Sequence, residues 1–71
     1  MKVRLKHERL AAELARKHLS LRGWARRLDL KSGHISQLAN GKRKFPDPET
    51  RRKLQDGLSL EFDDLFEVIA E

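Results

Sequence analysis

The stretch that decides the fold runs from residue 20 to residue 44 and reads SLRGWARRLDLKSGHISQLANGKRK. Its first half places apolar residues at the i, i+3, i+4, i+7 spacing of one helical face, at Leu21, Trp24, Ala25 and Leu28. A connection around Asp29 follows, and then a segment in which Ile35 and Leu38 share one face. The pattern predicts two short helices joined by a tight turn, the arrangement called helix-turn-helix.

The outward face of the second predicted helix is short, polar and free of formal charge. It consists of Ser32, Gly33, Ser36, Gln37 and Asn40. Three cations follow it directly, namely Lys42, Arg43 and Lys44. Because amides and hydroxyls can bond to the edges of base pairs while cations contact phosphates, we expect this helix to enter the DNA major groove.

Length and composition exclude several other classes of protein. Seventy-one residues are enough for one domain. The absence of cysteine excludes disulfides and thiolate metal sites, and the three histidines lack the spacing of a zinc site. No apolar run could span a membrane, and Lys2, Arg4 and Lys6 interrupt any signal peptide. We therefore expect a cytoplasmic protein with no cofactor and no membrane or small-molecule partner.

Charge is divided unevenly along the chain. Residues 1–44 hold thirteen Lys or Arg against three acids, whereas residues 45–71 hold three against eight. The first part suits a polyanion, and the second would be repelled by one. A lopsided solvated surface would have the same composition, but the coincidence with a helix-turn-helix pattern favours nucleic acid.

The N-terminal part of the chain reads as an arm followed by a helix. Residues 1–5 alternate basic and apolar side chains without a helix cap, so we expect a flexible basic arm, either frayed or reaching into a minor groove. A single domain would then cover residues 6–71. Its first helix, over 6–17, would place Leu10 and Leu14 inward.

Local signals also mark the ends of the next two helices. Ser20 is suited to cap the first of them, because its hydroxyl can accept a hydrogen bond from a free amide of the first turn. Asp29 should take the positive φ of the turn, at some cost compared with glycine. Ser32 or Lys31 begins the following helix, and Asn40-Gly41 should end it.

The loop and helix that follow have a strong start signal. Phe45 is the one apolar residue that we expect to anchor the basic loop. Asp47-Pro48 combines a capping carboxylate with a proline at the first helical position, so a helix should begin there. It would end near Leu58 and present Thr50 and Leu54 inward.

The last expected helix, over residues 62–70, has a wide apolar stripe. Phe62, Leu65, Phe66 and Ile69 form it, and Val68 adds to it. Either all of this surface is core, or part of it is a dimer interface made by Phe66, Val68 and Ile69.

Taken together, these features resemble the Cro and phage-repressor type of helix-turn-helix domain. The segment LRGWARRLDLKSGHISQLANGKRKFP is similar to that family's signature, and Pro46, Thr50 and Leu54 match the Pro-x-x-x-Thr…Leu pattern after it. The resemblance implies an all-α, compact, five-helix lambda-repressor-like fold with a helix-turn-helix at its second and third helices. It also implies a DNA-binding homodimer on a palindromic site, in a bacterial or phage protein associated with the nucleoid.

The same resemblance implies roles for individual residues. Base contacts would be made by Lys31, Ser32, Gly33, Ser36 and Gln37. Phosphate contacts would be made by Ser20, His34, Asn40, Lys42, Arg43 and Lys44. Gln37 is the best candidate for base readout, because its amide can pair bidentately with adenine N6 and N7.

The chain departs from the family pattern at three places. Asp29 stands where the family usually has glycine, and Lys31 where it often has Ser or Thr. Many members carry an Arg–Glu ion pair at the positions that here hold Leu14 and Ala39. Since both partners are replaced by apolar residues, which is the tolerable way to lose such a pair, we expect these two side chains to lie close together.

The leading hypothesis is a sequence-specific DNA-binding transcriptional regulator, with repression as the expected activity. The alternative is a DNA-binding partner module, such as an antitoxin or an accessory protein of a mobile element. An enzyme is not expected, because no carboxylate pair, activated nucleophile or Gly-rich phosphate loop can be assembled from these residues. RNA modules need aromatic stacking platforms that the sequence lacks.

Overall fold

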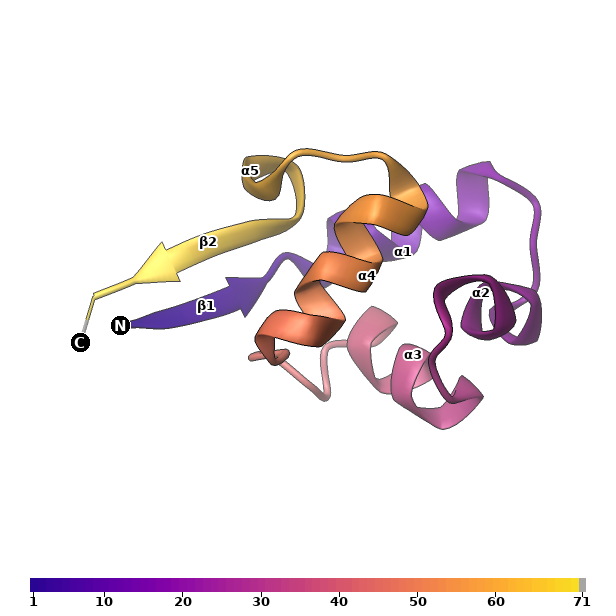
Figure 1. Cartoon of the computed structure of the whole chain (residues 1–71), viewed down its shortest axis with the longest axis horizontal. Coiled ribbons are helices and arrows are strands. Elements are labelled where there is room, and N and C mark those ends of the chain that lie inside the picture. The colour runs from indigo at the N-terminus through magenta and orange to yellow at the C-terminus, as the bar shows by residue number, and fades with distance from the viewer. Residues whose placement is uncertain (71) are drawn as a thin grey trace.

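The computed structural model describes residues 1–70 of the chain. Its elements are, in order, β1 (Lys2–Leu5), α1 (His7–Arg16), α2 (Leu21–Leu28), α3 (Ser32–Ala39), α4 (Pro48–Leu58), α5 (Phe62–Leu65) and β2 (Phe66–Ile69). The two strands lie side by side at one end of the molecule, and α2 lies at the other (Figure 1). The fold is thus mostly helical with a small two-stranded sheet, and Glu71, the last residue of the expected domain, lies outside the described residues.

The predicted caps set the helix ends as expected. The Ser20 Oγ accepts a hydrogen bond from the Gly23 amide at 3.1 Å, and the Asp47 Oδ1 accepts one from the Thr50 amide at 2.8 Å. Asp29 ends α2 in the left-handed conformation, with φ 57° and ψ 48°. The Ser20 and Asp47 side chains satisfy helix-end amides that have no partner inside the helix.

The core is apolar and is built around Trp24. This side chain is 1% exposed, and its Nε1–H donates to the Leu14 carbonyl at 3.1 Å, so the one polar group of the indole is satisfied. All five helices and both strands contribute the other buried apolar residues, which are Leu5, Leu10, Leu14, Ala25, Leu28, Ile35, Leu38, Leu54, Leu58, Leu65 and Phe66.

The expectations for the two ends of the chain are wrong, and the expected all-α class holds only in part, because a two-stranded sheet accompanies the five helices of residues 1–70. Segment 1–5, expected as a flexible arm, contains β1, and the helix expected over 62–70 ends at Leu65. The strands pair antiparallel with Leu5 opposite Phe66, and both side chains enter the core. Each short strand supplies the backbone partners that the other needs, and no local sequence signal records such a pairing.

Two apolar residues outside these ends also lie differently from the expectation. Leu21 is 43% exposed although its spacing placed it on the inner face of α2. Phe45 is 49% exposed and carries the Lys2 ammonium 5.0 Å from its ring centre. The neighbouring Pro46 is buried and anchors the loop in its place.

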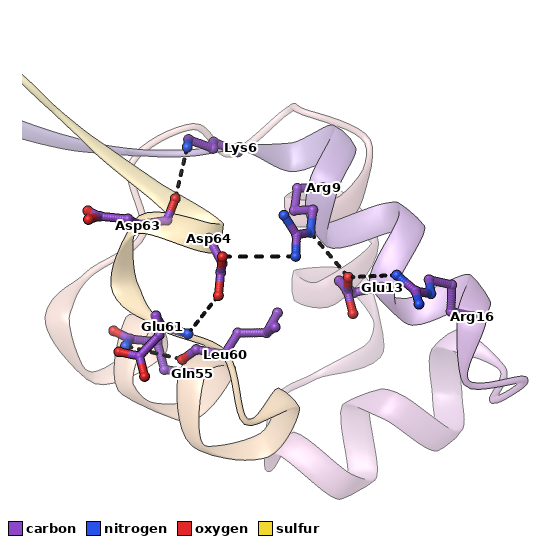
Figure 2. A network of polar contacts seen from close by, with 9 residues as sticks. All are labelled: Lys6, Arg9, Glu13, Arg16, Gln55, Leu60, Glu61, Asp63 and Asp64. Carbon is purple, nitrogen blue, oxygen red and sulfur yellow. Dashed lines mark hydrogen bonds and ion pairs between the residues drawn. The ribbon is translucent and has the colours of Figure 1, made fainter.

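A polar network ties α1 to α5 (Figure 2). Glu13 is 7% exposed and accepts from Arg9 at 3.1 Å, with Arg16 at 3.5 Å on the same oxygen. Arg9 also reaches Asp64 at 4.0 Å, and the Lys6 ammonium donates to the Asp63 carbonyl at 2.8 Å. Since β2 follows α5 directly, this network helps to hold the strand pair against the helices.

The proximity of Leu14 and Ala39 stays a prediction. Helices α1 and α3 pack together, Leu14 is buried, and Ala39 is half-buried against the core.

Candidate nucleic-acid interface

Helices α2 and α3 pack on one another and are joined by a short hydrogen-bonded turn. The Leu30 amide donates to the Ala25 carbonyl at 2.8 Å, and Leu30 is half-buried against the core. From α4, the Lys53 ammonium donates to the Asp29 carbonyl at 2.9 Å. The left-handed residue is therefore supported from a third helix, α4.

Helix α3 divides sharply into a buried face and an exposed one. Ile35 and Leu38 are both 0% exposed. The predicted base-contacting residues lie on the remaining surface, where Lys31, Ser32, Gly33 and Gln37 are exposed and Ser36 is half-buried. The exposed strip carries no charge between Ser32 and Gln37 apart from what His34 can acquire. Nothing within 4 Å would meet a side chain added at Gly33, so this position leaves open space on the strip.

The two ends of helix α3 are capped differently. Lys31 is its N-cap and makes no side-chain capping bond, so Ser32 is its first helical residue and not its cap. At the other end, the Asn40 Oδ1 accepts from the Lys42 amide at 3.0 Å. Gly41 then adopts φ 85°, and a Cβ there would lie 3.0 Å from the His7 ring. Both the backbone conformation and the available space require glycine at this position.

The basic loop Lys42–Lys44 is exposed and is fixed by backbone bonds at both of its ends. The Lys42 and Arg43 amides donate to the Gln37 carbonyl at 3.0 and 3.1 Å. The Leu5 amide of β1 donates to the Lys44 carbonyl at 2.9 Å. The strand that replaces the expected arm therefore positions the loop of cations, a role that local sequence patterns do not reveal.

The structure places Arg43 differently from the other cations of the loop. Its Nε donates to the Gln37 Oε1 at 2.6 Å, so a residue expected to contact phosphate lies on the residue expected to read bases. The spacing of six residues between them is not a helical contact spacing, so the sequence offers no signal for this pair.

His34 is half-buried beside the strip. It lines a cavity of about 300 Å³ with Arg43, Phe45, Pro46, Asp47 and Thr50. Burial and then the positive charge of Arg43 lower the pKa of His34 from its ordinary 6.5, which leaves the imidazole neutral at pH 7. It can then donate one hydrogen bond to a phosphate as a neutral group.

The three residues expected at a dimer interface all lie in β2, but they differ in exposure. Phe66 is 1% exposed and belongs to the core, so its inclusion in an exposed interface is wrong. Val68 is 54% exposed and Ile69 is half-buried. Val68 lies opposite Val3 in the sheet, on the side of Leu5 and Phe66.

No protein-family model, curated protein or solved structure matches this chain. Within residues 1–70, every helix is too short or too polar to cross a membrane. The same residues contain no group of three or more His, Asp or Glu side chains placed to hold a metal ion.

Proposed function

We propose that this protein is a sequence-specific DNA-binding transcriptional regulator that places α3 in the major groove. The observation that carries the proposal is the division of α3 into two faces. Ile35 and Leu38 are completely buried, while the opposite side offers hydroxyl, amide and open backbone positions bordered by Lys31 and the basic loop. In the major groove, base edges are read by hydrogen bonds and lie between two lines of phosphates. A polar strip bordered by cations suits that arrangement.

The phosphate contacts would come from both sides of α3. Ser20 lies at the N-terminus of α2, and Asn40, Lys42 and Lys44 follow α3. All are exposed, and the loop backbone is held by Gln37 and β1. The free amides and dipole at the start of α2 also favour a phosphate there.

Repression is the expected activity, with a homodimer on a palindromic site. A two-fold dimer matches two half-sites of operator DNA, and half-site spacing follows from the distance between its two recognition helices. With Phe66 in the core, the exposed Val68 and the neighbouring Ile69 are the candidates for subunit contact.

The alternative is a partner-binding module, such as an antitoxin or mobile-element accessory protein, and it is motivated by the apolar C-terminal stripe and the acidic charge of residues 45–71. Leu65 and Phe66 of that stripe are 0% and 1% exposed, so less of it is open to a partner than the sequence predicts. Recovery of a stable partner by co-purification would favour this alternative.

Equilibrium binding tests the proposal. Duplexes selected from a random pool should return one motif with two-fold symmetry, and the selected duplex should bind at least about 1,000 times more tightly than a random one. With six to ten phosphate contacts, log K should fall with log salt at a slope of about −5 to −9. Lys42→Ala should reduce that slope by about one unit and weaken all duplexes alike. Equal affinity for every sequence would reject the proposal.

A further inference from the structure

Gln37 and Arg43 are joined through both their backbones and their side chains. The Arg43 amide donates to the Gln37 carbonyl at 3.1 Å, and the Arg43 Nε donates to the Gln37 Oε1 at 2.6 Å. The first bond closes the end of α3 and holds the two Cα atoms near one another. The second therefore costs less side-chain entropy than a contact between two free side chains. Both residues are exposed, so the pair lies on the surface that α3 presents.

The chemistry of the pair determines which way the Gln37 amide points. A guanidinium has donors only, so the Gln37 oxygen must face Arg43 and the NH₂ group must face away. Within residues 1–70, the terminal amino groups of Arg43 make no hydrogen bond or ion pair. Together the two side chains offer the Gln37 NH₂ and both Arg43 amino groups, which are all donors.

We infer that Gln37 and Arg43 act as one base-reading unit that selects guanine, an inference that rests on the proposed DNA-binding function. Guanine presents two acceptors in the major groove, N7 and O6, whereas adenine presents the acceptor N7 and the donor N6. A bidentate contact to adenine needs the Gln37 oxygen, and Arg43 already occupies one of the two lone pairs of that oxygen. An adenine amino group there would also lie beside the hydrogens of a cation. Arg43 is therefore a specificity residue, and Gln37 favours guanine over the adenine that an isolated glutamine would choose.

The test begins with duplexes that the wild-type protein selects from a random pool. The base pair read by Gln37 is the one at which Gln37→Ala relaxes the preference. Competing duplexes that differ only there are then measured with Arg43→Lys, which keeps the charge but loses the planar set of donors. Lys44→Ala is the matched control, because it removes a neighbouring exposed cation. Circular dichroism shows that each variant is folded.

The wild type should prefer guanine at that base pair. Arg43→Lys should reduce the guanine-over-adenine ratio by about 5- to 150-fold, the range of one bidentate contact. Lys44→Ala should weaken both duplexes by the same factor. A wild-type preference for adenine there, or a ratio unchanged by Arg43→Lys, would overturn this inference alone. No sequence preference at any position in the wild type would instead refute the proposed function.

Discussion

Replacing Leu5 by alanine tests whether residues 2–5 form a strand packed on the core or a flexible arm. Leu5 is 3% exposed, lies opposite Phe66 in the sheet, and is part of the core. Truncating a buried leucine costs about 2–5 kcal/mol, through lost burial and the cavity left behind. Leu5 also lines a surface cavity, so we expect the lower part of that range, about 2–3 kcal/mol.

That loss is large for a domain of this size. The core of a domain of about seventy residues supplies roughly 3–5 kcal/mol of net stability, so Leu5→Ala should remove most of that stability. The melting temperature should fall by about 10–20 °C. With a urea dependence of about 1 kcal/mol per molar, the midpoint should fall by about 2–3 M.

The assay is urea unfolding followed by the fluorescence of Trp24, the single tryptophan, which is 1% exposed in the native state. Leu19→Ala is the matched control, because Leu19 is 39% exposed and its truncation should change the free energy of unfolding by less than about 0.5 kcal/mol. If Leu5→Ala unfolds at the same urea concentration as Leu19→Ala, β1 is not packed on the core, and the reasoning about the strand pair is refuted.

Three further predictions concern single polar residues. Ser20→Asp keeps a good N-cap but brings a negative charge to a proposed phosphate contact. The free energy of unfolding should therefore stay within about 0.5 kcal/mol of the wild type, while duplex affinity falls. A variant that binds duplex as tightly as the wild type would remove Ser20 from the interface. Hydrogen bonds from Thr50, chiefly its hydroxyl and then its amide, lower the pKa of Asp47 below its ordinary 3.8. The native state therefore binds fewer protons than the unfolded chain, so this contribution to stability is present above pH 3.8 and is lost as pH falls through the lower native pKa. Asp47→Asn should flatten that acid-side loss in urea midpoints measured from pH 6 to 2, and an unchanged slope would contradict the assignment. Because the pKa of His34 is lowered, its protonation should strengthen duplex binding only below pH 6.5, and His34→Gln should abolish that rise in titrations at fixed salt. A rise that persists in the variant would assign it to another group.

Much of the helix-turn-helix could be predicted because its signals are local. The cap at Ser20, the left-handed residue at Asp29 and the Asp47-Pro48 helix start each depend on residues within one turn. The burial of Ile35 and Leu38 follows from helical spacing. The sequence therefore locates the candidate reading surface on α3, but it does not show which side chains of that surface contact one another.

The amino-acid sequence alone determines where the helices around the turn begin and end, and which face of α3 is polar, because neighbouring residues within a helical turn set those features. Only the tertiary structure decides that the chain ends form a sheet, with Arg4 and Glu67 paired across 63 positions, and that β1 holds the Lys44 carbonyl. It likewise decides that Arg43 binds the Gln37 amide. A strand of four residues has no stability by itself, so its existence depends on a distant partner and on the core that both strands cover.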